Sequence, residues 1–134
     1  MIEQTLSIIK PDAVERNLDS KIKSFFEKNN LKILQSKKVK ISKEEAYEFY
    51  KVHQTKPFYN DLCNYLSSGP IVVMILEGED AVIKNRELMG ATDPNKAEEG
   101  TLRKLYGISI DKNSIHGSDS VSNAKTEINF FFNK

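Results

Sequence analysis

The pattern of hydrophobic positions along the chain predicts four β-strands. Residues 5–9 alternate polar and apolar side chains and are rich in β-formers, which is typical of a strand. Residues 31–41 predict a second strand, with lysines on its outer face. Residues 71–76 are continuously apolar and the run is short, so we expect a central strand there. A short apolar segment that begins at Ile115 predicts the fourth strand.

Apolar residues at helical spacing predict helices between and after these strands. The expected helix caps and starts are Asp19, Ser42 with Glu45 as a capping box, Pro57, Asp80, and one of Ser118, Asp119 and Ser120. The residues that these helices are expected to bury are Ile22, Phe25, Phe26, Ala46, Phe49, Tyr50, Tyr59, Leu62, Cys63, Leu66, Val121, Ala124, Ile128 and Phe131. We expect the helix that follows Asp80 to end at Gly90.

The order of these elements predicts an α+β fold. Strand, helix, strand, helices, strand, helix, loop, strand and helix follow one another, which is the pattern of two split βαβ halves. We therefore expect one domain over residues 1–134, with a four-stranded antiparallel sheet covered by helices and His116 near one edge of a cleft. Residues 91–114 are mostly polar and predict a long loop, and loops of such length in small domains are usually functional.

Composition narrows the classes of function. The chain has 134 residues and a formal net charge of +1, so no whole-molecule field favours nucleic acid or a membrane surface. No apolar run approaches the roughly 20 residues of a membrane span, and the first residues lack the pattern of a signal peptide. The single cysteine, Cys63, fits a reducing compartment, and its neighbours favour a buried small hydrophobe over a catalytic thiol. These features predict a cytoplasmic protein.

Two histidines are the first candidates for chemistry. His53 lies on the predicted helix face of Ala46, Phe49 and Tyr50, where a packed or solvent-touching residue is the simpler interpretation. His116 stands where the long loop meets a strand and a helix cap, and Gly117 beside it allows a ligand to approach the backbone. Imidazole is an intrinsically good nucleophile near neutral pH, although a structural histidine at a turn explains the sequence equally well. Glu127 could hold the other ring nitrogen, but its spacing alone favours a solvated helix face.

A phosphate group needs cations and hydrogen-bond donors. Lys10 ends the first predicted strand, Arg86 lies within a predicted helix, and Arg103 lies in the long loop with Thr92 and Thr101. Arginine suits phosphate because its planar fork can donate two parallel hydrogen bonds. Each of these side chains taken singly is more often a surface charge. The glycine-rich P-loop pattern is absent from the sequence, so a nucleotide would be held by side chains from scattered segments.

These residues fall within blocks that resemble the nucleoside diphosphate kinases over nearly the whole chain. The matching blocks, in order, are residues 5–14, Tyr50, residues 57–59, 68–70, 85–94, 100–103 and 113–120. The last block, which contains His116, is similar to the active-site signature of the family. The resemblance implies a ferredoxin-like βαββαβ core. It also implies a ping-pong reaction, in which a nucleoside triphosphate phosphorylates His116 and a nucleoside diphosphate then accepts the group.

The resemblance also implies roles for particular residues. Those matching the family's phosphate and ribose contacts are Lys10, Tyr50, Arg86, Thr92, Arg103 and Asn113. Phe58 matches the residue that stacks on the base, with Leu62 and Ile110 beside it. Glu127 matches the carboxylate that orients the nucleophilic ring, supported by Ser118. Mg²⁺ is implied as a cofactor held mainly by nucleotide phosphates, with no metal site of the protein's own, and the protein is expected to be a homo-oligomer, either a tetramer or a hexamer.

The chain differs from the family pattern at a few positions. Glu99 stands in place of the usual proline, residues 104–106 differ from the usual sequence, and Asn17 replaces a common glycine. The last change is mild, because asparagine tolerates a left-handed backbone.

Two other functions are compatible with many of the residues described above. One is a nucleotide- or nucleic-acid-binding module without turnover, and the other is a phosphohistidine carrier whose acceptor is a protein. A base-stacking residue such as Phe58 argues mildly against the carrier.

Overall fold

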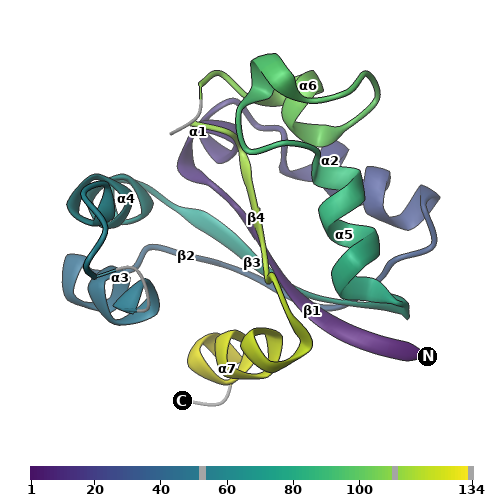
Figure 1. The fold of residues 1–134 in the computed structure, drawn as a ribbon, viewed down its shortest axis with the longest axis horizontal. Helices are drawn as coiled ribbons and strands as arrows, with labels where there is room; N and C mark the ends of the chain where they lie inside the picture. Colours follow the sequence, from purple (N-terminus) through teal and green to yellow (C-terminus); the bar gives the residue numbers. More distant parts are fainter. Residues whose placement is uncertain (52–53, 110–111, 133–134) are drawn as a thin grey trace.

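The computed structural model describes residues 1–51, 54–109 and 112–132, and its centre is a four-stranded antiparallel sheet (Figure 1). The strands are β1 (Ile2–Ile9), β2 (Lys32–Val39), β3 (Ile71–Glu79) and β4 (Ile115–Gly117). They lie in the order β2-β3-β1-β4, so β1 and β3 are central and the short β4 lies at one edge beside β1. The predicted fold class is thereby confirmed.

Helices cover both faces of this sheet (Figure 1). They are α1 (Pro11–Glu15), α2 (Asp19–Lys28), α3 (Lys43–Phe49), α4 (Tyr59–Leu66), α5 (Ala81–Met89), the 3₁₀ turn η2 (Pro94–Lys96), α6 (Leu102–Tyr106) and α7 (Val121–Phe132). In the part of the chain that the structure describes, no helix is long and apolar enough to cross a membrane.

Strand β3 is continuously apolar because it lies between two hydrophobic cores. Met74 and Leu76 face the core that also contains Phe26 of α2, whereas Ile71 and Val73 face the core that contains Leu66 of α4. Both sides of the strand therefore exclude water, and full burial of one such side chain stabilises the fold by about 1.5–3 kcal/mol. Cys63 is buried in the second core, as predicted, and burial raises the pKa of its thiol.

Several local predictions are confirmed by hydrogen bonds or by backbone geometry. The capping box before α3 is complete, with Glu45 N donating to Ser42 Oγ and Ser42 N donating to Glu45 Oε1, both at 3.1 Å. Of the three candidate caps for α7, Ser120 accepts a hydrogen bond from Asn123 N at 3.0 Å. Asn17 has a left-handed backbone with φ 59°.

Other local predictions are wrong. Asp19 does not cap α2, because Leu18 is already in a helical conformation and Asp19 is the first residue of the helix. Asp80 occupies the cap position of α5, but its side chain makes no cap hydrogen bond, and the Glu3 carboxylate accepts from Val82 N instead. Val121, expected to be buried, is exposed because α7 turns its first residue away from the sheet.

The segment predicted as one long loop contains two short helical elements, η2 and α6. The residues that follow Lys10 likewise form a short helix, α1, with proline at its first position. Each of these elements is only a single turn or slightly longer, so little apolar periodicity marks it in the sequence. The predictions made for His53 and Ile110 lie outside the described residues.

Candidate active site

The edge strand β4 places His116 on the face of the sheet covered by α3 and α7. His116 pairs with Ile8 of β1, and its neighbours Ile115 and Gly117 are buried on the opposite side of the strand. The imidazole is about one-fifth exposed and packs edge-on against Phe49, with ring centroids 5.5 Å apart. From the sequence, Phe49 was predicted only as a core residue, because the helical period that predicts burial does not indicate what the buried ring contacts.

A carboxylate holds one nitrogen of this imidazole. His116 Nε2 lies 3.1 Å from Glu127 Oε1, and the Ser118 hydroxyl donates to the same oxygen at 2.8 Å. An ionised carboxylate only accepts hydrogen bonds, so this contact places the ring proton on Nε2. The lone pair is then on Nδ1, which makes no hydrogen bond with any residue that the structure describes. The structure thus brings together the three residues His116, Ser118 and Glu127.

Tyr50 also lies close to the ring of His116. Its ring centroid is 6.3 Å from that of His116, and its side chain is almost fully buried. Burial, reinforced by the nearby Glu127 carboxylate, raises the pKa of Tyr50. The phenol therefore stays neutral near physiological pH and keeps its proton.

Lys10 and Asn113 form a second polar group, where β1 ends and the loop before β4 begins. The buried Lys10 donates from Nζ to Asn113 Oδ1 at 2.9 Å, and Asn113 Nδ2 donates to the Thr92 carbonyl at 3.1 Å. Three segments distant in sequence therefore meet at this point. An ammonium group and an amide, both shielded from bulk water, form a favourable environment for an anion.

Arg103 and Arg86 bring two positive charges into the same region. Arg103 is 9% exposed and donates to the carbonyls of Gly90, at 3.1 Å, and Ile115, at 2.9 Å. Burial, together with the Arg86 guanidinium, lowers the pKa of Arg103 to about 10, which leaves it charged at neutral pH. Two neighbouring cations in a partly desolvated site are stabilised by a bound anion, so this pair favours a phosphate ligand.

Phe58 and Leu62 lie on a separate element, α4. Phe58 precedes the first turn and is 44% exposed, and Leu62 is one turn further on, where its amide donates to the Phe58 carbonyl at 3.0 Å. An exposed aromatic ring beside a half-buried leucine provides an apolar surface of the kind on which a base can stack. The third predicted member of this group, Ile110, is not among the described residues.

The charged groups around His116 do not resemble a protein metal centre. Within residues 1–51, 54–109 and 112–132, no three His, Cys, Asp or Glu side chains form a group that could hold a metal ion. Glu127 is the carboxylate beside His116, and it is engaged by the ring and by Ser118.

Comparison with known proteins gives one consistent family. The model of the nucleoside diphosphate kinase family matches residues 3–134. The chain is 58% identical over 131 residues to a nucleoside diphosphate kinase of a Nitratiruptor species, in a match that covers 98% of this chain and 96% of that protein. It superimposes with a TM-score of 0.96 on a crystal structure of the Aquifex aeolicus nucleoside diphosphate kinase, at 41% identity, covering 98% of this chain and 96% of that one.

Proposed function

Because the chain belongs to the nucleoside diphosphate kinase family, and is thus an enzyme that transfers phosphate between nucleotides, we propose that it does so through a phosphohistidine on His116. The observation that carries this proposal is the contact between His116 Nε2 and Glu127 Oε1 at 3.1 Å. It supports Nδ1 as the attacking atom, because a ring nitrogen must have its lone pair available in order to attack phosphorus.

The proposed reaction has two symmetric halves. In the first, Nδ1 of His116 forms a bond to the γ-phosphorus of a nucleoside triphosphate, and the bond from that phosphorus to the bridging oxygen breaks. The nucleoside diphosphate leaves with the electron pair of that bond. In the second half, a terminal oxygen of another nucleoside diphosphate attacks the phosphorus and the N–P bond breaks. Glu127 accepts the Nε2 hydrogen bond throughout and stabilises the positive charge that the phosphorylated ring carries.

Charge stabilisation is the second part of the proposal. Phosphoryl transfer spreads charge over three equatorial oxygens, so positioning and electrostatics supply most of the catalysis. We assign phosphate contacts to Lys10, Arg86 and Arg103. The ribose and the remaining phosphate oxygens would be held by Tyr50, Thr92 and Asn113. The support for these roles is the burial of Lys10 and Arg103 and the mutual proximity of the two arginines.

We assign the base to the apolar surface on α4. Phe58 would stack on the base, with Leu62 and Ile110 beside it. Stacking uses the π-face that every base has, so the proposed acceptors and donors are nucleoside di- and triphosphates without restriction to one base. The exposed fraction of Phe58, 44%, supports this role, because part of the side chain is accessible from solvent.

The proposed cofactor is Mg²⁺, carried to the site on the nucleotide. When bound, the ion neutralises charge on the phosphate oxygens and orients them. The chain's own part is to hold the phosphates that carry the ion, through Lys10, Arg86 and Arg103. We place the enzyme in the cytoplasm, a location supported by the single, buried Cys63.

The test is transfer between two different nucleotides. Purified protein is incubated with ATP, GDP and Mg²⁺, and the products are separated to look for GTP. We expect GTP to form with a double-reciprocal pattern of parallel lines, as a ping-pong reaction requires. A protein that binds both nucleotides but forms no GTP would be a binding module. A protein that becomes labelled by ATP but passes nothing to GDP would be a phosphohistidine carrier, and either result would contradict the proposal.

A further inference from the structure

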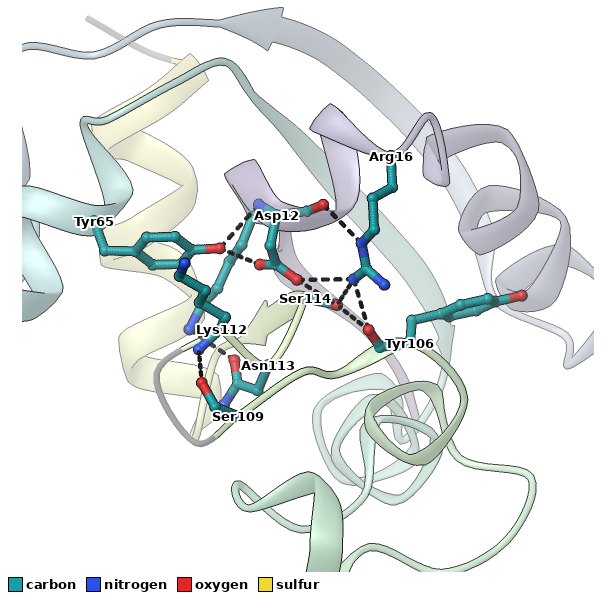
Figure 2. Close-up of polar contacts among 9 residues, drawn as sticks. Asp12, Arg16, Tyr65, Tyr106, Ser109, Lys112, Asn113 and Ser114 are labelled. Atoms are coloured by element: carbon teal, nitrogen blue, oxygen red, sulfur yellow. Dashed lines mark hydrogen bonds and ion pairs between the residues drawn. The ribbon is translucent and has the colours of Figure 1, made fainter.

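A second polar network lies beside the proposed phosphate contacts, and none of the roles assigned above uses it. Asp12 is the second residue of α1 and has a side chain only 3% exposed, and it forms an ion pair with Arg16 at 3.0 Å (Figure 2). The Ser114 hydroxyl donates to Asp12 Oδ2 at 2.7 Å. Ser114 stands two residues before His116 and directly after Asn113, so this carboxylate reaches the loop that leads into the site.

The hydrogen bonds of this network join four segments of the chain. Arg16 Nη2 donates to Ser114 Oγ at 3.0 Å and to the Tyr106 carbonyl at 2.6 Å. The Tyr65 hydroxyl donates to Asp12 Oδ1 and accepts from Asp12 N at 2.9 Å. Ser114 has one hydroxyl proton, and we assign it to Asp12 because that contact is shorter and the acceptor is charged. Helices α1 and α4, the end of α6 and the turn before β4 are thus held together.

Ser114 needs this support because its backbone is strained. Its φ is +73°, in the left-handed region, where a residue with a side chain loses roughly 1–2 kcal/mol relative to its normal conformation. Such a residue persists where its surroundings over-determine it, and such residues cluster at active sites. The network supplies that constraint, since the Ser114 hydroxyl both donates to Asp12 and accepts from Arg16.

The strained turn determines where two phosphate contacts lie. The Ser114 carbonyl accepts the backbone N–H of Lys10 at 2.9 Å. The preceding residue, Asn113, accepts the Lys10 side chain, also at 2.9 Å. Lys10 is therefore held from its backbone and from its ammonium group by two consecutive residues. A change in the backbone at Ser114 would move both of these partners at once.

We propose that Asp12, Arg16 and Tyr65 are positioning residues that hold Ser114 in its left-handed turn and thereby aim Lys10 and Asn113 at the nucleotide phosphates. This inference rests on the function proposed above and deepens it. Among the described residues, the hydrogen bonds of this network link Asp12, Arg16, Tyr65, Tyr106 and Ser114 and include neither Phe58 nor His116. Its expected effect is therefore on recognition of the phosphate chain rather than of the base. If the network were only structural, its loss would lower the free energy of unfolding and would not weaken binding of ADP more than binding of adenosine.

The test compares affinity for ADP with affinity for adenosine, which has no phosphate. Tyr65→Phe removes one hydroxyl from the network, and Ser114→Ala removes the other. We expect each variant to bind ADP about tenfold more weakly, the effect of misplacing a charge-assisted hydrogen bond, and to bind adenosine within about twofold of the unchanged protein. Tyr59→Phe is the matched control, because its hydroxyl donates to the Tyr47 carbonyl at 2.7 Å, away from this network. It should change neither affinity.

Ser114→Gly separates the hydroxyl from the backbone strain. Glycine adopts φ +73° at no steric cost, so this variant should keep the turn without the hydroxyl and bind ADP more tightly than Ser114→Ala does. If Ser114→Ala and Tyr65→Phe both bind ADP within twofold of the unchanged protein, or if Ser114→Gly binds ADP as weakly as Ser114→Ala, the positioning role is wrong. Equal losses for ADP and adenosine would also overturn it. Failure of the unchanged protein to form GTP would instead refute the proposed function.

Discussion

The orientation of a single imidazole is the feature on which the chemistry depends at the scale of residues. His116 and Glu127 are 11 positions apart, and a short turn capped by Ser120 brings helix α7 back over strand β4. The number of residues between them does not predict this contact, because it depends on the turn between β4 and α7. Without that turn, Glu127 would face solvent. The family resemblance predicted the pair because the motif specifies the turn as well as the residues.

Glu127→Gln tests the charge of this carboxylate. The amide oxygen can still accept the Nε2 proton, so the ring keeps its orientation, but the positive phosphohistidine loses its counter-charge. We expect the rate of His116 phosphorylation in a single turnover to fall about 10- to 100-fold, with the apparent affinity for ATP within about threefold. Rapid-quench labelling gives both quantities. A change in affinity with no change in rate would show that Glu127 acts in binding.

Phe58→Ala tests the stacking surface. Loss of the ring removes an interaction of roughly 1–3 kcal/mol that does not depend on the identity of the base. We therefore expect the Michaelis constants for adenine, guanine, cytosine and uracil nucleotides to rise by similar factors. Steady-state kinetics with the four diphosphates measures this. A loss confined to one base would mean that a specific hydrogen bond dominates recognition there.

Among the secondary-structure elements, the short strand β4 can pack against helix α5 only because residue 117 is a glycine. A Cβ added to Gly117 would lie 2.3 Å from Asn85 Nδ2 and 2.8 Å from Met89 Cε, so α5 packs directly on the strand. Asn85 is fully buried and Met89 nearly so, which leaves neither side chain open space to move into. The close approach of helix and strand is what fixes the position of His116 relative to α5.

We predict that Gly117→Ala destabilises the fold by about 1–3 kcal/mol, the usual cost of overpacking, and slows phosphorylation of His116 by displacing β4. Urea denaturation measures the first effect and single-turnover labelling the second. Gly69→Ala is the matched control, because its added Cβ would meet only Pro11 Cβ at an ordinary 3.6 Å. If both variants are equally stable, α5 and β4 do not pack as tightly as described.

Local sequence signals predicted some elements well and others poorly, for physical reasons. The Ser42 and Glu45 capping box was predictable because both hydrogen bonds are local. The cap of α5 was not, because Glu3 reaches Val82 from a strand 79 positions away, in a contact that depends on the sheet register. Helix α6 and turn η2 are short and packed against other segments, so tertiary contacts stabilise them more than any pattern within them.

At the scale of the whole molecule, the order of elements was sufficient to predict the sheet. Alternating strands and helices that pack in split βαβ halves leave few arrangements, and the observed order β2-β3-β1-β4 is one of them. The candidate site was predictable only in part. Lys10, Arg86 and Arg103 each resemble surface charges in the sequence, and burial of Lys10 and Arg103 arises only when the end of β1, helix α6 and the residues around the start of β4 come together.

We predict that the protein is a homo-oligomer. Strand β2 lies at the outer edge of the sheet, and the exposed side chains of Leu105 and Ile108 lie in α6 and in the segment between α6 and β4. Unpaired strand edges and exposed apolar side chains are features that partner subunits commonly cover. Light scattering should give a mass that is a multiple of 15.3 kDa, as a tetramer or a hexamer. A monomer at working concentration would contradict this prediction.

Labelling by ATP decides whether His116 is the residue that carries the phosphoryl group. Protein incubated with γ-labelled ATP is split into acid-treated and base-treated samples, because phosphohistidine is labile in acid whereas phosphoserine is not. We expect an acid-labile label on the unchanged protein and on His53→Ala, and none on His116→Ala, whose transfer rate should fall on the order of 10⁶-fold, as when another covalent enzyme loses its nucleophile. Loss of the label in His53→Ala but not in His116→Ala, or an acid-stable label that persists in His116→Ala, would show that another residue carries the phosphoryl group.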